Sequence, residues 1–104
     1  MMIQFQPDMV LVAEATNGTE AIQKFKDLQP DVTLMDLRLP DMSGVDALMT
    51  IRADSPAARI VMLTTFESDV DIRRALEAGA RAYLLKTMPP KDLANAIRKV
   101  HREP

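Results

Sequence analysis

The sequence contains no cysteine, and only 4% of its 104 residues are aromatic. The lack of cysteine excludes disulfide bonds and thiolate metal sites, and it is compatible with a reducing compartment. No apolar run approaches the ~18 residues that a membrane span needs, and the first residues lack the basic region of a signal peptide. We therefore expect a cytoplasmic protein with no membrane contact.

Runs of one charge are missing as well. The chain has 13 basic and 15 acidic residues, which gives a net charge of -2 at pH 7. It contains no run of five or more residues of the same charge. A nucleic-acid-binding face usually contains a basic stripe, whereas the basic pairs here, at 73–74 and 98–99, are short. Direct nucleic-acid binding by this chain is not expected.

The chain does contain a regular alternation of two kinds of segment. Short apolar runs, which we predict to be strands, alternate with amphipathic stretches that have helical spacing. The runs lie at residues 9–13, 32–35, 60–63 and 82–85. The first run, at residues 9–13, is apolar throughout, as strands covered on both faces are. Strict alternation predicts one domain over residues 1–104, with a parallel sheet, helices on both faces and right-handed crossovers.

Residues with clear roles at helix ends punctuate this pattern. Asn17 with Glu20 three positions later predicts a capped helix start, and Ser43 predicts another. Gly79 stands where a helix would end in the left-handed conformation, and Pro90 suits the first turn of the last helix. These signals place the helices between the apolar runs.

A polar side chain stands at or just after the end of three of the apolar runs. These residues are Asp36, Thr64 and Lys86. In open α/β sheets, ligands bind beyond the carboxyl ends of the strands, so the three side chains would meet at one edge if their strands are parallel neighbours. A carboxylate can attack phosphorus, and a lysine and a hydroxyl can donate to phosphoryl oxygens. The pattern favours a phosphoryl site.

Each of these residues also has an ordinary structural interpretation. Asp36 alone would be a turn or cap residue, and Thr64 a strand-end hydroxyl bonded to the backbone. Lys86 alone would be a solvated charge on an apolar stem. Only their joint occurrence, each at its own strand end, favours a phosphoryl site.

Several segments resemble the receiver domains of bacterial response regulators. Residues 32–44 read VTLMDLRLPDMSG, residues 60–66 read IVMLTTF and residues 78–86 read AGARAYLLK. These segments resemble, in the correct order, the phosphorylation segment, the fourth strand and the fifth strand with its lysine. Residues 17–18 and 90–93 also match. The resemblance covers essentially the whole chain and is closest to the NarL/FixJ/LuxR-type branch.

The resemblance implies a flavodoxin-like, or CheY-like, doubly wound fold and a set of roles. Asp36 would accept a phosphoryl group from the phosphohistidine of a sensor histidine kinase. Lys86 would contact that group, Thr64 would move to hydrogen-bond it, and Tyr83 would swing inward with it, although core packing also accounts for a tyrosine there. Arg38 would offer its backbone carbonyl to Mg²⁺. Such a domain is no enzyme beyond its own phosphorylation and dephosphorylation.

The chain departs from the family at its N-terminus. Receivers have five strands in the order 2-1-3-4-5, and residues 9–13 match the second of them. The first strand and most of the first helix are missing, so four strands and four helices are expected from an incomplete receiver domain without an output domain. We expect either that residues 9–13 pair directly beside 32–35, or that a second chain fills the gap.

This departure also affects the metal site. In the family, an acidic pair after the first strand helps to hold Mg²⁺, and the chain lacks that pair. Asp41 and Glu67 are poor substitutes in loops, and Asp8 should lie at the edge opposite Asp36. Since Mg²⁺ needs few protein carboxylates, weak binding through Asp36 and the Arg38 carbonyl is expected, or none.

The sequence leaves three hypotheses for the function of the chain. The first is a phosphoacceptor receiver with a sensor histidine kinase as partner. The second is a non-phosphorylated pseudo-receiver that dimerises or competes with full-length response regulators. The third is an enzyme acting on a small phosphorylated substrate at the same edge. The third would need a glycine-rich phosphate loop, and the 3 glycines of the chain are scattered.

Overall fold

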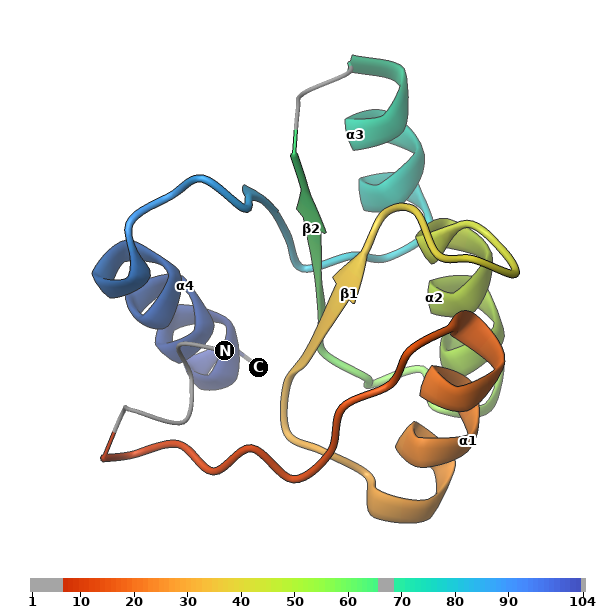
Figure 1. Ribbon diagram of the computed structural model, residues 1–104, viewed down its shortest axis with the longest axis horizontal. Helices are drawn as coiled ribbons and strands as arrows, with labels where there is room; N and C mark the ends of the chain where they lie inside the picture. Colours follow the sequence, from red (N-terminus) through yellow and green to blue (C-terminus); the bar gives the residue numbers. More distant parts are fainter. Residues whose placement is uncertain (1–6, 66–68, 104) are drawn as a thin grey trace.

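A computed structural model describes residues 7–65 and 69–103 of the chain (Figure 1). In that part of the chain, helices and strands alternate. None of these helices has both the length and the apolar character needed to cross a membrane. In chain order the elements are α1 (Gly18–Leu28), β1 (Thr33–Asp36), α2 (Gly44–Asp54), β2 (Ile60–Thr64), α3 (Asp69–Glu77), β3 (Ala82–Leu85) and α4 (Pro90–Arg102).

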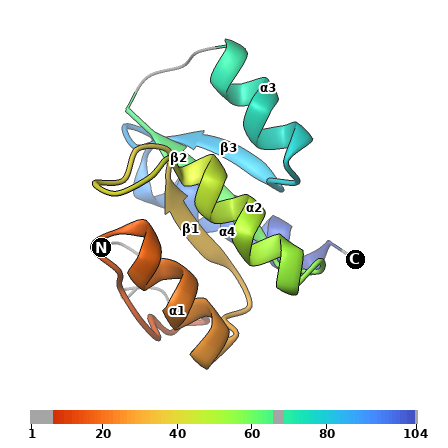
Figure 2. The same cartoon turned by 90° about the vertical axis from the view of Figure 1, so that its right-hand side faces the viewer.

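The strands form one parallel sheet in the order β1-β2-β3. α1, α2 and α3 lie on one face of the sheet and α4 lies on the other (Figures 1 and 2). β2 is buried at every position, whereas most residues of β1 and all of β3 are half-buried. The predicted parallel sheet with helices on both faces is confirmed.

The side chains of β2 pack alternately into two layers of the hydrophobic core, one on each face of the sheet. Ile60 and Met62 belong to a cluster with residues of α1, α2 and α3. Val61 and Leu63 point to the other face because successive side chains of a strand alternate, and that face is covered by α4. The α4 residues buried there are Ala94, Ile97 and Val100. β2 is therefore fixed from both sides.

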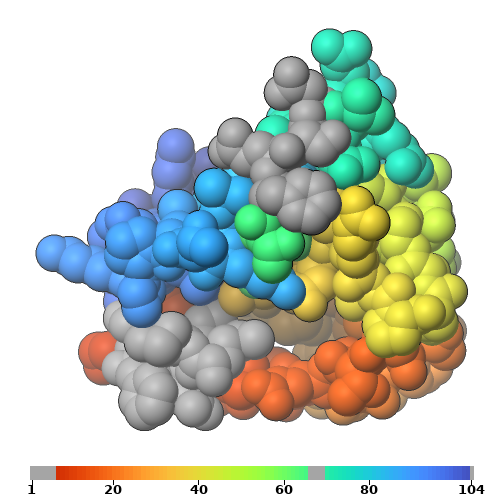
Figure 3. Space-filling model, turned by 45° about the horizontal axis from the view of Figure 1, so that its top comes forward, coloured from red at the N-terminus to blue at the C-terminus, as the bar shows by residue number. Residues whose placement is uncertain are grey.

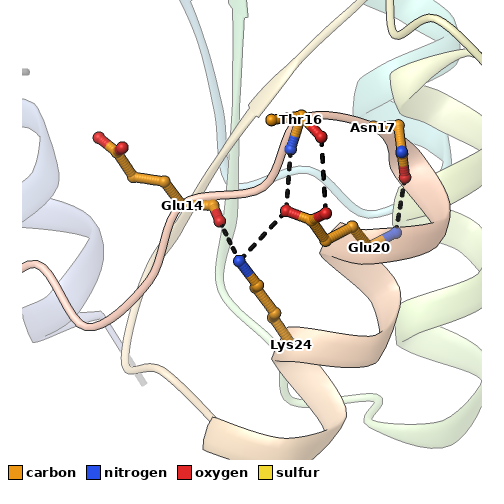
Figure 4. A network of polar contacts seen from close by, with 5 residues as sticks. All are labelled: Glu14, Thr16, Asn17, Glu20 and Lys24. Carbon is orange, nitrogen blue, oxygen red and sulfur yellow. Dashed lines mark hydrogen bonds and ion pairs between the residues drawn. The ribbon is translucent and has the colours of Figure 1, made fainter.

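The predicted helix ends are confirmed. Asn17 Oδ1 accepts a hydrogen bond of 2.8 Å from the Glu20 backbone N–H, and Ser43 Oγ accepts one of 3.1 Å from Asp46. The Glu20 carboxylate reaches back to Thr16, whose N–H donates to it at 3.2 Å, one residue earlier than in a standard capping box (Figure 4). Gly79 has φ 107°, as its place after α3 requires.

The strand predicted at residues 9–13 is wrong, and so is the count of four strands in the described residues. The segment is extended, but no strand of the described residues pairs with it. A strand exists only through its ladder, and residues 9–13 do not reach the free edge of β1. Direct pairing of residues 9–13 with 32–35 is therefore also wrong, and residues 7–65 and 69–103 form a sheet of three strands.

Candidate functional site

The carboxyl edge of the sheet brings together Asp36 and Lys86, with Thr64 between their strands. Asp36 ends β1, Thr64 ends β2 and Lys86 follows the last residue of β3. Lys86 Nζ lies 3.1 Å from Asp36 Oδ2, and the Lys86 backbone N–H donates to the Thr64 carbonyl at 2.7 Å. Figure 3 looks onto this edge, with the end of β2 in green between the blue segment after β3 and the yellow segment after β1.

The three side chains differ in their access to solvent. Asp36 and Lys86 are 43% and 41% exposed, whereas Thr64 is only 5% exposed. An ion pair this open to water contributes ~1 kcal/mol or less to stability. Lys86 can therefore leave the Asp36 carboxylate for another anionic oxygen at little cost. The pair is accessible to a phosphoryl donor, and the hydroxyl beside it is shielded.

The position of Asp36 is set by the start of α2. Leu37, the next residue, donates its N–H to the Leu63 carbonyl at 2.9 Å and accepts from the Gly44 N–H at 2.6 Å. A Cβ on Gly44 would overlap the Asp36 carbonyl oxygen and lie 2.8 Å from Met62 Cε. Only glycine lets the helix start approach the strand end this closely. The backbone of Asp36 is thus held between β2 and α2.

Arg38 lies two residues beyond Asp36, in the exposed loop that joins β1 to α2. A backbone bridge between Arg38 and Ser43 closes this loop, and Leu39 donates to the Met42 carbonyl at 3.2 Å. The loop therefore holds the Arg38 backbone on the same edge of the sheet as the Asp36 carboxylate.

Asp41 has a structural role that the sequence reasoning missed. Its Oδ1 accepts from the Gly18 N–H at 2.7 Å, and its Oδ2 accepts from the Thr19 hydroxyl and N–H at 2.7 and 3.0 Å. These bonds, first of all the one from the Thr19 hydroxyl, hold the pKa of the Asp41 carboxyl below its ordinary value of 3.8. Asp41 joins the loop after β1 to the first turn of α1 and is not a spare metal ligand.

Replacing Asp41 by asparagine is expected to lower the free energy of unfolding at neutral pH. The variant should also lose less of its stability than the parent as the pH falls. Because the folded-state pKa is depressed, the stabilisation by Asp41 is present above its ordinary value of 3.8 and is lost as the pH falls through the lower folded value. Urea midpoints of parent and variant, measured from about pH 5 downward, should therefore converge. A constant difference across that range would contradict the assignment.

Tyr83 packs against the main core cluster, beside Met62 of β2. Its hydroxyl is buried and has no hydrogen-bond partner within residues 7–65 and 69–103. A buried hydroxyl without a partner costs stability, so a movement that gives this group a partner would recover part of that cost. The structure therefore places Tyr83 in the core, with an unmet polar group.

The described residues do not form a magnesium site by themselves. They contain no cluster of three acidic or histidine side chains that could hold a metal ion. Asp36 is the one carboxylate near Lys86 for which a contact is established, Asp41 is held by α1, and Asp8 is held by Arg98 on α4. Glu67 lies outside the described residues. A single carboxylate and a backbone carbonyl fit Mg²⁺ poorly.

Comparison with known proteins gives a consistent result. Residues 1–98 match the family described as the response regulator receiver domain. The chain is 46% identical over 97 residues to the response regulator protein VraR of Staphylococcus aureus. The aligned residues cover 93% of this chain and 46% of that protein. The chain thus spans about half the length of this curated relative.

Two solved structures share the arrangement of helices and strands. A LuxR-family two-component response regulator from Aurantimonas has a TM-score of 0.91 at 35% identity, with 96% of this chain and 71% of that chain covered. A LuxR-family DNA-binding response regulator from Staphylococcus aureus has a TM-score of 0.89 at 27% identity, with 97% and 87% covered.

Proposed function

The chain belongs to the response regulator receiver domain family, and from this premise we propose that it accepts a phosphoryl group on Asp36. The donor is the phosphohistidine of a sensor histidine kinase, and the chain works in the cytoplasm. The observation that carries the proposal is the solvent-open pair of Asp36 and Lys86 at the carboxyl edge of a parallel sheet, beside Thr64. This arrangement combines a nucleophile, Asp36, with two side chains that can donate hydrogen bonds to phosphoryl oxygens.

In the proposed transfer, a carboxylate oxygen of Asp36 forms a bond to phosphorus while the phosphorus–nitrogen bond of the donor breaks. The products are an acyl phosphate on Asp36 and an unmodified histidine. Lys86 moves from the carboxylate to a phosphoryl oxygen and offsets its charge, and the Thr64 hydroxyl donates to a second oxygen. Tyr83 swings inward with Thr64, and its hydroxyl, which is buried without a partner among the described residues, can gain one in that movement. The later hydrolysis of the acyl phosphate restores Asp36.

In this proposal, Mg²⁺ contributes less to phosphorylation than it does in receiver domains generally. When bound, Mg²⁺ offsets charge on the phosphoryl oxygens. The described residues near Asp36 offer it a poor fit, so we expect slow phosphorylation that depends weakly on added Mg²⁺.

The test is incubation of the whole chain with acetyl phosphate, with and without Mg²⁺, followed by intact-mass measurement and peptide mapping. We expect one phospho-adduct on the peptide that contains Asp36, and we expect hydroxylamine to remove it, because hydroxylamine cleaves acyl phosphates. A folded chain that forms no adduct, or an adduct resistant to hydroxylamine, would sink the proposal.

A second candidate function is a non-phosphorylated interaction module that dimerises or competes with full-length response regulators. The observation in its favour is that the described residues contain no group of three acidic or histidine side chains that could hold a metal ion, and that Asp41 is committed to α1. It predicts a folded chain without adduct that still associates with itself or with a full-length regulator in sedimentation experiments.

Replacing Lys86 by methionine is expected to slow adduct formation by about 10²–10³-fold, the usual cost of removing one donor to developing negative charge. Stability should change by ~1 kcal/mol or less because the pair is exposed. Time courses of intact mass measure the rate. Lys91→Met, on the exposed first turn of α4, is the matched control and should react like the parent; equal rates in the two variants would argue against a phosphoryl contact by Lys86.

A further inference from the structure

One of the two asparagines of the chain, Asn17, is followed by a glycine. In such a pair, the backbone nitrogen of the glycine can attack the side-chain carbonyl carbon of the asparagine. Glycine permits this attack best because it has no Cβ to hinder the approach. The other asparagine, Asn95, lies inside α4 and is followed by an alanine. By its neighbour, Asn17 is therefore the more reactive of the two, and the structure around it decides how fast it reacts.

The reaction is an intramolecular deamidation that needs water as its co-reactant. The Gly18 nitrogen loses its proton and forms a bond to Asn17 Cγ, while the bond from Cγ to the side-chain nitrogen breaks and ammonia leaves. Water then opens the resulting five-membered succinimide at either of its carbonyl groups. One product is aspartate with the original backbone, and the other is isoaspartate, whose backbone continues through the former side chain. Both products carry a negative charge that asparagine lacks.

The attacking nitrogen is held by the carboxylate of Asp41. The Gly18 N–H donates to Asp41 Oδ1 at 2.7 Å, and the Thr19 N–H and hydroxyl donate to Asp41 Oδ2 at 3.0 and 2.7 Å. Gly18 is buried, and the side chain of Met42 fills the space that a Cβ on it would take. Because a nearby negative charge disfavours the loss of a proton, the Asp41 carboxylate makes the Gly18 nitrogen a poorer nucleophile.

The side chain under attack is held by the start of α1. Asn17 Oδ1 accepts from the Glu20 N–H at 2.8 Å, and Figure 4 shows the side chain pointing toward that group. The backbone of Asn17 is extended, with ψ 174°. Ring closure requires a rotation about the Cα–C bond that brings the Gly18 nitrogen alongside Cγ. That rotation carries the Gly18 N–H away from Asp41, so the reactive conformation excludes this hydrogen bond.

These contacts can open without unfolding of the whole chain. Asp41 and Thr19 are both exposed, one in the loop after β1 and the other in the first turn of α1. Loops and helix ends open locally at a smaller cost in free energy than global unfolding. Local release of this loop from α1 is therefore the route by which Asn17 reaches its reactive conformation.

We propose that Asn17 is a site of intramolecular deamidation, and that the hydrogen bond between Asp41 and the Gly18 N–H controls its rate. While the loop after β1 is bound to α1, the reaction is slow, and when the loop leaves α1, the reaction proceeds. Isoaspartate adds one atom to the backbone before Gly18, so the helix cap and the Asp41 contact no longer fit together. Deamidation thus makes the release of the loop permanent. The assignment goes beyond phosphorylation of Asp36 and does not depend on it.

The experiment incubates the whole chain in mildly alkaline buffer and follows both asparagines by tryptic peptide mapping. The peptide that ends at Lys24 contains Asn17, and the peptide at residues 92–98 contains Asn95. Mass spectrometry detects the exchange of an amide for a carboxyl group, and chromatography separates aspartate from isoaspartate. Asp41→Ala should deamidate at residue 17 at least about tenfold faster than the parent, since a hydrogen bond to a charged group is lost. Asn95 is the internal control and should react equally slowly in both chains.

Two further variants test the cause of this acceleration. Asp46→Ala removes an exposed aspartate from the first turn of α2 and leaves Asp41 in place, so it should react like the parent. Adding Gly18→Ala to Asp41→Ala should restore the slow rate of the parent, because the new Cβ hinders the attack on Asn17. A double variant that stays fast would mean that Gly18 is not the nucleophile, and the proposal would be wrong.

The permanent release of the loop has its own readout. Ion exchange separates the deamidated chain from the parent by its added negative charge, and amide exchange is then measured by NMR. In the isoaspartate form, exchange at Gly18 and Thr19, whose N–H groups donate to Asp41, should be about tenfold faster than in the parent. Unchanged exchange at both residues would show that the loop stays bound after deamidation.

Two results would overturn control by Asp41. The first is an equal rate at residue 17 in Asp41→Ala and the parent. The second is an equally fast reaction of the parent in urea, at the concentration that lowers its stability to that of the variant, since global unfolding would then account for the rate. If Asp41→Ala does not fold, Asp41→Asn takes its place, because it keeps the shape and removes the charge. Asp36→Asn should deamidate like the parent, which separates this test from that of phosphorylation.

Discussion

Asp36→Asn is expected to reduce the phospho-adduct to background while leaving the fold intact. Asparagine has nearly the shape of aspartate, but its neutral amide oxygen is no nucleophile toward phosphorus. The ion pair that is lost with Lys86 is open to water on both sides, so stability should change by ~1 kcal/mol or less. Intact mass after acetyl phosphate treatment measures the adduct, and urea unfolding measures the stability.

Asp54→Asn is the matched control because it makes the same chemical change at an exposed aspartate, the last residue of α2. It should form as much adduct as the parent. If Asp36→Asn keeps a substantial adduct, the phosphoryl group is carried elsewhere and the assignment of Asp36 is wrong. If Asp54→Asn also loses the adduct, the reaction depends on total negative charge rather than on one nucleophile.

The sequence predicted this edge of the sheet well because its signals are local. An apolar run followed by a polar residue marks the end of a buried strand, and parallel strands end at the same edge. Asp36, Thr64 and Lys86 could therefore be placed together without any knowledge of distances. The helix starts at Asn17 and Ser43 were predictable for the same reason, since a cap and its partner lie three residues apart.

The failure at residues 9–13 has the opposite cause. An apolar run records that a segment can be a strand, but pairing depends on a neighbour that can be far away in the sequence or on another chain. In the structure the residues on either side of this segment, Glu14 and Asp8, accept hydrogen bonds from Lys24 of α1 and Arg98 of α4. These polar contacts are not part of the apolar pattern. Residues 9–13 therefore stay outside the three-stranded sheet of the described residues.

The contacts of Asp41 could not be predicted for a related reason. Asp41 binds Gly18 and Thr19, which precede it by 23 and 22 residues. Within its own loop it has the character of an ordinary turn residue. No spacing rule connects it to α1, so only the packing of α1 against α2 reveals its role. Long-range polar contacts of this kind decide which carboxylates near Asp36 are available.

Gly44→Ala is expected to destabilise the chain by about 3 kcal/mol, at the upper end of the usual cost of overpacking. The added Cβ would overlap the Asp36 carbonyl oxygen, and a backbone atom cannot move aside by changing a rotamer. The strand end or the helix start must shift, and the Gly44–Leu37 hydrogen bond lies at that junction. Since whole domains have only about 5–15 kcal/mol of stability, the loss should be large in urea unfolding.

Gly18→Ala is the matched control because both glycines directly follow a capping residue, Asn17 or Ser43, and open a helix. Any gain in helix propensity from alanine is then the same in both variants. The atoms nearest to a Cβ on Gly18 all belong to the side chain of Met42, which is flexible and can move away by changing its rotamer. Gly18→Ala should therefore be far more stable than Gly44→Ala. Equal urea midpoints would mean that the close approach of α2 to Asp36 does not constrain the site, and Asp36 would then depend on the β1–β2 ladder alone for its position.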